Sequence, residues 1–425
     1  MSILIKNIKQ LVTCAAKGRC PKKGDQQSDI ELMENANVFI DNEKIDFTGS
    51  ESELKIYLKE TGKKDFNVID GSNKTIMPGF TDCHTHFVFA GSRENEYEMR
   101  LSGMSYQDIA KAGGGIISTV NAVRSCSKES LKKNAEDKLK KFISYGTTTI
   151  EGKSGYGLDT KNEIKILEVM NELNTQNEFG LDIIPTFLGA HSIPPEMAKE
   201  EYVNLICNDM IPVISGNNLA KFVDIFIEEN YFDNIDADRI FSIGIKNGLV
   251  PKLHTDQFTS MGGIDTAIKY KAASVDHLEV LKNEDILKLA EFNKSNLRNI
   301  TAVLLPGVSY FLDIPYQPAR EIISSNIPVA LATDFNPGSC MTENLQIIMS
   351  LASLKLKMSA EEIINAVTIN AAYALNMESV TGSIEKGKQA DILIFDMPSY
   401  KFLLYNFGVN NLEQVIKKGT VVYQS

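Results

Sequence analysis

Eight apolar, β-rich runs alternate with helix-like stretches in the middle of the chain, and this alternation limits the possible folds more than any other feature. Strands that are apolar throughout are typical of a parallel sheet covered by helices. Eight such units in about 270 residues predict a closed (β/α)8 barrel, an α/β fold of the TIM-barrel type. The runs lie at residues 75–83, 147–150, 182–189, 222–227, 249–254, 273–277, 300–305 and 327–333, and the helix-like stretches at 130–144, 161–175, 235–246, 262–271, 283–293, 317–325 and 342–356.

Both ends of the chain have a different pattern, made of short strands and turns. Residues 36–40 and 44–47 flank an Asp-Asn pair and predict a hairpin. Residues 390–395 and 414–423 again look like strands. Because neither end has enough strands to be stable alone, we expect both to join in one small β domain, a β-sandwich. The predicted domains are residues 1–74 with 380–425 for the small β domain, and residues 75–379 for the barrel.

Charge and cysteine usage exclude several classes of protein. The 44 Lys and Arg against 55 Asp and Glu give a net charge of −11. This balance argues against nonspecific binding of nucleic acid or an anionic membrane, since both need a basic surface. Six scattered cysteines fit a reducing compartment. With no apolar run long enough to span a membrane and no signal-peptide pattern, we expect a cytoplasmic protein. The sequence leaves a homodimer open.

The five histidines of the chain show where its chemistry is expected. They are His84, His86, His191, His254 and His277, and each lies at or just past the C-terminal end of a predicted barrel strand. Asp334 follows the eighth strand in the same way. Active sites of these barrels are built at this rim from the ends of different strands. The sequence therefore predicts an active site there.

Four of these residues form a candidate metal site. His84 and His86 are two positions apart, so they share one face of an extended strand. Such a pair alone is more often two ordinary strand histidines. Together with His254 and Asp334, however, it offers three imidazoles and a carboxylate, which suit zinc or iron. We expect one Zn²⁺ or Fe²⁺/Fe³⁺ ion per chain.

The segments PGFTDCHTH, ATDFNPG and GSIEKGKQADILIFD resemble the amidohydrolase superfamily over essentially the whole chain. The resemblance implies that the first-strand His-x-His pair, the fifth-strand His and the eighth-strand Asp hold a metal. Members with two metals usually have a bridging carboxylated Lys or a Glu from the fourth strand. Here that strand, residues 222–227, has no Lys and is followed by Glu228. One ion is therefore preferred, with Glu228 as the alternative bridge.

Longer motifs are similar to those of the imidazolonepropionase family, and they occur in the expected order. They are HTHFVFAGSRENEYEMRLSGMSYQDIAKAGGGI, EGKSGYG, TFLGAHSIPPE, LHTDQF and ATDFNPGSCMT. The resemblance implies hydrolysis of 4-imidazolone-5-propanoate to N-formimidoyl-L-glutamate, the third step of histidine degradation. A related deaminase or cyclic amidase stays as the alternative enzyme. A catalytically dead relative is disfavoured because all four metal-ligand positions are present.

The implied substrate is a small cyclic amide with a carboxylate, and it needs a cation in an acidic protein. Arg93 can supply a bidentate guanidinium that a Lys cannot match. The alternative is a solvated loop arginine. Tyr106 and Tyr156 can offer hydroxyl groups to the same end of the substrate, although a packing role competes, more seriously for Tyr106. The glycines around Tyr156 favour an exposed loop.

The remaining substrate contacts rest mainly on the resemblance. It assigns His191 to the ring carbonyl, with a buried structural histidine as the alternative. Gln257 lies three residues beyond His254, where some family members have Glu; an amide can contact the ring but cannot act as a general base. Residues Asn336, Gly338 and Ser339 follow Asp334 and either bind the ring or product or simply form a turn.

A division of catalytic roles follows from these positions. A metal ion lowers the pKa of a water molecule bound to it. His277, on the sixth strand and outside the proposed ligand set, is expected to orient or deprotonate that water, and Asp334 to share the proton. His191 or the metal would stabilise the oxyanion. The glycine run at 113–115 lacks the features of a phosphate-binding loop, and we expect a tight or mobile loop there.

Overall fold

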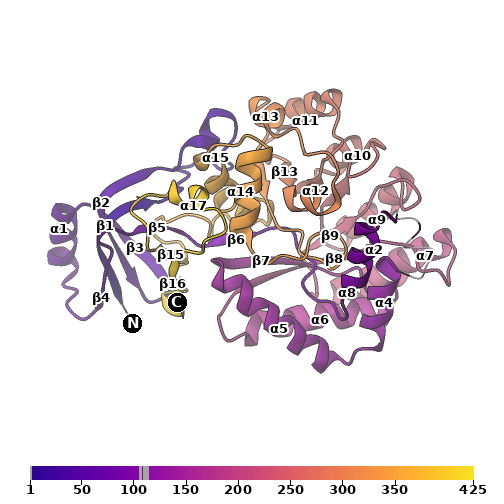
Figure 1. The fold of residues 1–425 in the computed structure, drawn as a ribbon, viewed down its shortest axis with the longest axis horizontal. Helices are drawn as coiled ribbons and strands as arrows, with labels where there is room; N and C mark the ends of the chain where they lie inside the picture. Colours follow the sequence, from indigo (N-terminus) through magenta and orange to yellow (C-terminus); the bar gives the residue numbers. More distant parts are fainter. Residues whose placement is uncertain (1, 105–107, 109–113) are drawn as a thin grey trace.

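Parallel strands in eight positions form the centre of the chain in a computed structural model, which describes residues 2–104, 108 and 114–425 (Figure 1). The predicted (β/α)8 barrel is confirmed, and its fifth position is divided into two short strands. The barrel strands are β6 (Phe80–Asp82), β7 (Thr147–Lys153), β8 (Asp182–Ala190), β9 (Phe222–Ile225), β10 (Val250–Pro251) with β11 (Leu253–Thr255), β12 (Ser274–His277), β13 (Thr301–Leu304) and β14 (Val329–Leu331).

Hydrogen bonds and bridges close these strands into a ring. One half has the order β10-β9-β8-β7-β6 and the other β11-β12-β13-β14, and all their pairings are parallel. A bridge between Phe226 and His254 joins the halves on one side. A bridge between Thr85 and Phe335 closes the ring on the other side. The segments that follow β6 and β14 are therefore neighbours, which places residues 84–86 beside Asp334.

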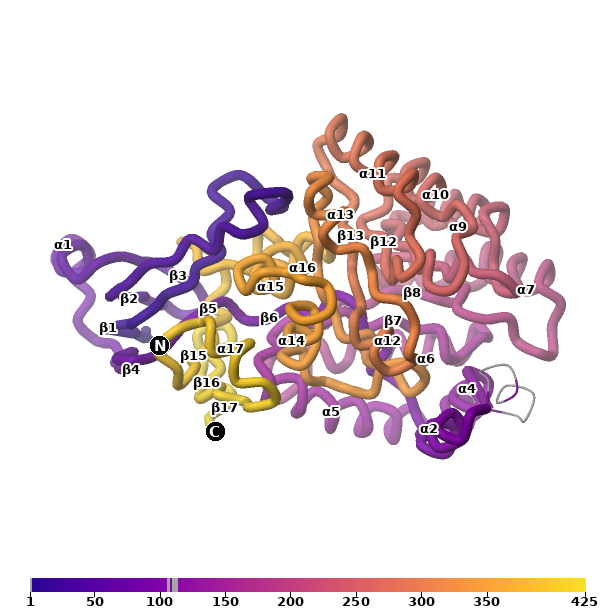
Figure 2. The backbone as a smooth tube through the Cα atoms, turned by 45° about the horizontal axis from the view of Figure 1, so that its top comes forward, coloured from indigo at the N-terminus to yellow at the C-terminus, as the bar shows by residue number. Residues whose placement is uncertain are grey.

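The outer helices pack on the barrel with one apolar face each, and α5 (Lys128–Ser144) is an example. Its hydroxyl N-cap Ser127 accepts a hydrogen bond from the Ser130 amide. Leu131, Ala135 and Leu139 are buried at four-residue spacing, so they share one face of the helix. Figures 1 and 2 show this and the other outer helices around the barrel. They include α6 (Thr160–Gln176), α7 (Lys199–Leu205), α8 (Ile211–Gly216), α9 (Asn234–Lys246), α10 (Gly263–Tyr270), α11 (Asn283–Ser295), α13 (Ala319–Ser324), α14 (Leu345–Lys355), α15 (Ala360–Ala366) and α16 (Ile369–Ala374).

Strands from both chain ends share one sheet, seen at the left of Figure 1. The sheet order is β17-β16-β15-β5-β1-β2-β3, with β4 paired to β1. It curls so that Ile5 and Ile40 share a buried core with Ile392 and Ile416, in the manner of a β-sandwich. The predicted hairpin is confirmed by the antiparallel β2–β3 pair. The strands are β1 (Ile3–Val12), β2 (Leu32–Asp41), β3 (Lys44–Gly49), β4 (Asn67–Asp70), β5 (Thr75–Pro78), β15 (Ile392–Phe395), β16 (Leu412–Lys417) and β17 (Thr420–Gln424).

The structure divides the predicted first barrel strand, residues 75–83, into two strands. Strand β5 belongs to the sheet of the chain ends, where it pairs with β1 and β15. The barrel strand β6 begins only at Phe80. The chain passes between the two sheets at Gly79, where a Cβ atom would lie 2.1 Å from the Thr148 hydroxyl oxygen. Only glycine fits this close approach, so an apolar run that looks continuous in sequence changes sheets here.

Several helices lie outside the predicted pattern. Helix α1 (Glu51–Thr61) packs on the sheet of the chain ends, and α2 (Glu94–Leu101), α4 (Ile116–Ser125) and α12 (Pro306–Leu312) lie in loops beyond barrel strands. The others are the short helices at Gly24–Ser28 and Ile206–Met210 and α17 (Phe402–Tyr405). Among the residues that the structure describes, we find no helix with the length and apolar character needed to cross a membrane.

Candidate active site

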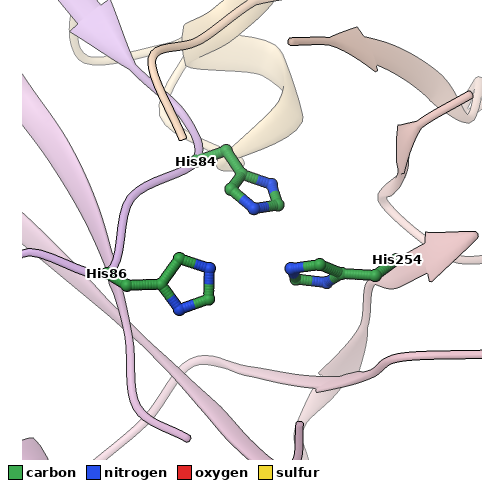
Figure 3. A group of neighbouring side chains, drawn as sticks. All are labelled: His84, His86 and His254. Carbon is green, nitrogen blue, oxygen red and sulfur yellow. The ribbon is translucent and has the colours of Figure 1, made fainter. Parts of the chain in front are cut away.

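Three imidazoles converge at the mouth of the barrel (Figure 3). His84 and His86 follow β6, and His254 lies in β11. The candidate ligand nitrogens of these three residues all lie within 4.8 Å of one another. The Oδ1 atom of Asp334 lies 3.4 Å from His84 Nε2 and 3.5 Å from His86 Nε2. The structure therefore brings together the four residues that the sequence predicts as metal ligands.

The chemistry of these atoms fits a metal ion. In the described part of the chain, His84 Nε2, His254 Nε2 and Asp334 Oδ1 are buried and make no hydrogen bond. Buried polar atoms without partners are costly, and a cation would satisfy all three. Burial lowers the pKa of His84 and of His86 well below the usual range, so both imidazoles are neutral, the form that binds metals. These residues thus provide a possible site for a transition metal.

Two buried carboxylates orient the histidines from behind. Asp276 Oδ2 lies 2.6 Å from His84 Nδ1, and Asp224 Oδ2 lies 3.0 Å from His254 Nδ1. Asp276 can accept the Nδ1 proton of His84, which leaves Nε2 of that ring as the ligand atom. Asp224 lies at ion-pair distance from His254 Nδ1. The sequence analysis did not identify these two residues. Their signal in the sequence was an Asp inside a short buried strand, where a carboxylate needs a partner.

A pocket opens over this cluster and collects most of the predicted site residues. Tyr106 lies outside the described residues, and His84 is buried below the pocket wall. The sequence analysis missed five apolar or aromatic residues of the wall, Ile116, Phe226, Tyr231, Phe258 and Leu312. The predicted residues in the wall are His86, Arg93, Tyr156, His191, His254, Gln257, His277, Asp334, Asn336, Gly338 and Ser339.

Arg93 is held in place by an acidic neighbour that the sequence analysis did not single out. Its Nε and one terminal nitrogen both lie 2.7 Å from Glu96 Oε2. The Oε1 atom of Glu96 accepts a hydrogen bond from the Gly115 amide (3.0 Å), so the pair connects α2 to the start of α4. A Cβ atom on Gly338 would lie 2.4 Å from the other terminal nitrogen of Arg93. Glycine at 338 therefore leaves room for the guanidinium.

The loop that carries Tyr156 is fixed by a buried carboxylate. Glu163 accepts hydrogen bonds from the backbone amides of Gly155, Gly157 and Leu158 at 2.7–3.2 Å. The Tyr156 side chain is buried in the pocket wall, 5.4 Å from the His191 ring. The glycines beside Tyr156 had favoured an exposed loop, but this loop is held against the barrel.

The hydrogen bonding of His191 restricts what this residue can do. Its Nδ1 lies 3.2 Å from the Gly155 carbonyl oxygen, which can only accept, so Nδ1 carries a proton. Burial, with the nearby His254, lowers the pKa of His191 to about 3, and the ring is therefore neutral. Its Nε2 is then an acceptor. The ring stacks on His86 at 4.9 Å.

The segment after Asp334 is a side-chain-stabilised turn that also orients the carboxylate. Asn336 Oδ1 accepts from the amides of Gly338 (2.8 Å) and Ser339 (2.9 Å), and its Nδ2 donates to the Asp334 carbonyl (2.8 Å). The Ser339 hydroxyl donates to Asp334 Oδ2 at 3.0 Å. Asp334 Oδ1 is left facing the imidazoles. Of the two interpretations of these residues, the structure shows the turn, and this turn orients Asp334 toward the candidate metal site.

His277 lies beside the cluster and has a carboxylate behind it. Its ring centre is 5.2 Å from that of His254, and its Nδ1 lies 3.5 Å from Glu279 Oε1. Gln317 donates to the same oxygen at 2.9 Å. Burial alone would lower the pKa of His277, but the Glu279 carboxylate outweighs it and raises that pKa. The backbone φ of +86° at His277 is unusual for a residue with a side chain and holds the ring at the strand end.

Glu228, the alternative bridging residue, is occupied elsewhere. Its carboxylate accepts hydrogen bonds from the amides of Phe258 (2.9 Å) and Thr259 (3.2 Å) and from the Thr259 hydroxyl. These contacts hold the loop after β11. Glu228 is not part of the three-histidine cluster in the described part of the chain.

Comparisons with known proteins agree with this fold. The amidohydrolase family model matches residues 256–422. Solved structures with the same fold include guanine deaminase from E. coli (14% identity, TM-score 0.72, covering 99% of both chains). An atrazine chlorohydrolase from Arthrobacter aurescens in complex with zinc is also similar (16% identity, TM-score 0.70, covering 99% of this chain and 95% of that one). The fold and the site thus define an amidohydrolase, a class of hydrolases.

Curated relatives narrow the class to one family. An imidazolonepropionase from Thermoanaerobacter pseudethanolicus is 46% identical over 98% of this chain and 96% of its own length. Those from Shouchella clausii and Clostridium tetani are 42% and 41% identical, over 99% and 100% of this chain and 93% and 98% of their own lengths. The chain belongs to the imidazolonepropionase family.

Proposed function

We propose that the protein hydrolyses the cyclic amide bond of 4-imidazolone-5-propanoate to give N-formimidoyl-L-glutamate. The observation that carries the proposal is one pocket that joins the three-histidine cluster to Arg93. The cluster offers a place for the ring carbonyl and a nucleophile, and Arg93 offers a cation for the carboxylate. The test is an assay on freshly prepared 4-imidazolone-5-propanoate together with metal analysis of the purified protein. No ring opening by the metal-loaded protein would refute the proposal.

The proposed cofactor is one Zn²⁺ or Fe²⁺/Fe³⁺ ion per chain, held by His84, His86, His254 and Asp334. Such an ion, when bound, acidifies water and polarises a carbonyl group. Its single occupancy is supported by Glu228, whose carboxylate is engaged with the loop after β11.

Side chains of the pocket carry out the proton transfer and bind the substrate ring. His277 takes a proton from the attacking water, and Glu279 keeps the imidazole oriented for that transfer. Asp334, whose pKa burial raises to about 6, can share this proton. His191 accepts a hydrogen bond from a ring N–H of the substrate at Nε2, because its Nδ1 already donates to Gly155. A donor role toward the oxyanion would first require His191 to take up a proton.

The substrate is held at its other polar groups by the pocket wall. Arg93 binds the propionate, and Tyr156 and Tyr106 are proposed to support the same end. Gln257 contacts the ring as an amide. Residues Asn336, Gly338 and Ser339 act mainly by shaping the turn, which positions Asp334 and leaves space for Arg93.

Replacing Arg93 tests the identity of the substrate. A charge-assisted pair of this kind contributes about 1.5–3 kcal/mol, so we expect Arg93→Ala to lower kcat/KM roughly 10- to 200-fold with metal content unchanged. Arg93→Lys should recover only part of this loss, because a point charge lacks the planar fork. Steady-state kinetics with the natural substrate and with an analogue bearing a neutral amide measure the effect.

The neutral analogue is the control in this experiment. The unmodified enzyme should discriminate against it, and Arg93→Ala should lose most of that discrimination. If the variant discriminates as strongly as the unmodified enzyme, Arg93 does not bind the carboxylate. A deaminase or another cyclic amidase, the alternative function, would then be favoured.

The division into domains is also a proposal. We propose residues 1–74 with 380–425 as a small β domain and residues 75–379 as the catalytic barrel, supported by the sheet shared by both chain ends. Strand β5 belongs to that sheet, so the boundary in space lies near Gly79. The cytoplasm as the compartment and a homodimer as the assembly stay predictions from the sequence.

A further inference from the structure

A buried ammonium group lies among three carboxylates inside the barrel, below the three histidines. Lys153 ends strand β7 and its side chain is fully buried. Its Nζ atom lies 2.7 Å from Asp224 Oδ2, 3.1 Å from Glu151 Oε1 and 3.4 Å from Asp276 Oδ2. All three carboxylates are also fully buried. Neither the predicted site nor the pocket wall includes Lys153.

Two of these carboxylates are the ones that orient the candidate metal ligands. Asp224 contacts His254, and Asp276 contacts His84. One ammonium group therefore touches the acidic partners of two imidazoles that come from different strands. A displacement of Lys153 would change the positions of both carboxylates and, through them, of both rings.

A second buried lysine differs from Lys153 in what it contacts. Lys252 Nζ lies 2.7 Å from Glu151 Oε2 and 3.2 Å from the Cys83 carbonyl, but 3.9 Å from Asp276. It makes no ion pair with Asp224 within the described residues. Burial would lower the pKa of Lys153, but Asp224 and the other two carboxylates outweigh it and hold that pKa above its ordinary value.

The acidic groups around Lys153 have the spacing of a metal site. Ligand atoms of His84, Glu151 and Asp276 lie within 4.8 Å of one another, the second such group in the described part of the chain. The Lys153 ammonium contacts both carboxylates of this group. Three converging carboxylate oxygens are also a suitable environment for a divalent cation.

We infer that Lys153 is a fixed cation in the position that a second metal ion would take, where it holds Asp224 and Asp276 against His254 and His84. Lys153 is thus a positioning residue that restricts the centre to one ion. This inference rests on the proposed metal centre and deepens it.

The test begins with the metal content of the unmodified protein and of two Lys153 variants. Lys153→Ala removes the charge and opens space between three carboxylates, so we expect about two ions per chain after loading with Mn²⁺ or Zn²⁺ and gel filtration. Lys153→Met removes the charge but fills the space, and it should keep one ion. Elemental analysis and competition with a chromophoric chelator measure both quantities.

Thermal unfolding supplies a readout that does not depend on activity. Without metal, both Lys153 variants should unfold about 5–15 °C below the unmodified protein, because three buried carboxylates lose the cation that they share. Added Mn²⁺ should restore most of this loss in Lys153→Ala and little of it in Lys153→Met. Lys252→Ala is the matched control, since it removes an equally buried ammonium whose only close carboxylate among the described residues is Glu151. It should bind one ion and show no recovery beyond that of the unmodified protein.

The outcomes separate the inference from the function on which it rests. One ion in Lys153→Ala, with a response to Mn²⁺ like that of Lys252→Ala, overturns the inference and leaves the proposed metal centre intact. An unmodified protein that binds no metal refutes the metal centre itself. If Lys153→Ala folds only when Mn²⁺ is supplied during refolding, the inference is supported. Failure to refold with Mn²⁺, while Lys252→Ala refolds, contradicts it.

Discussion

His254→Ala is expected to lose most of the bound metal and, with it, nearly all activity. His254 supplies one of the three imidazoles of the cluster, and its Nε2 is among the buried atoms without a hydrogen bond in the described residues. The variant removes one of the four proposed ligands and opens the site on the β11 side, so the affinity for the metal should fall sharply. We expect kcat/KM to fall about 10³-fold or more, because acidified water is no longer available. Elemental analysis and steady-state kinetics on the same preparation measure both losses.

His191→Ala is the matched control for that experiment. This imidazole also lies in the pocket and stacks on His86, but it is not in the ligand cluster. Its variant should keep the metal while substrate binding weakens. Full metal content in His254→Ala would show that the fifth strand does not provide a ligand.

His277→Ala should separate proton transfer from metal binding. His277 lies beside the cluster, with Glu279 and Gln317 behind it, and is not among the converging ligand atoms. We therefore expect near-normal metal content and a fall in kcat of about 10²-fold or more, the range of a lost general acid–base group. Metal analysis of the purified variant and its kcat on the natural substrate are the two measurements.

Glu279→Gln tests the same proton transfer with a smaller change, because it leaves His277 in place. It keeps a polar group of the same size next to His277 Nδ1 but removes the charge that raises the pKa of this histidine. A smaller loss of kcat than in His277→Ala, with the pH profile displaced toward lower pH, is the expected result. A His277→Ala protein that is purified without metal would instead place His277 among the ligands.

The barrel and the strand-end residues could be predicted from sequence because their signals are local. Each apolar run defines its own strand, and a histidine at the end of a run is placed at the rim once the barrel is assumed. That His84 and His86 lie on the same side of the chain could be predicted from the two-residue period of a strand alone. The pairing of Arg93 with Glu96 was also within reach, because residues three apart approach each other at the start of a helix.

The interior charges could not be predicted in the same way. Lys153, Asp224 and Asp276 are ionisable residues within buried strands, and most of their partners lie on other strands. Such contacts depend on which side chains point inward and at what depth, and this is set only when the barrel closes. The change of sheet at Gly79 could not be predicted either. In the sequence, Pro78 and Gly79 are equally compatible with a small irregularity inside one strand and with a break between two strands.

The sheet shared by the two chain ends has a consequence for the order of events during synthesis. Strand β5, which leads directly into the segment with His84 and His86, pairs with β15, translated roughly 300 residues later. During synthesis, β5 therefore lacks one of its neighbouring strands until β15 has left the ribosome. Proteolysis that removes the C-terminal strands would expose one edge of β5. Because β5 leads into β6 and the two histidines after it, loss of these distant strands should also loosen the positions of His84 and His86.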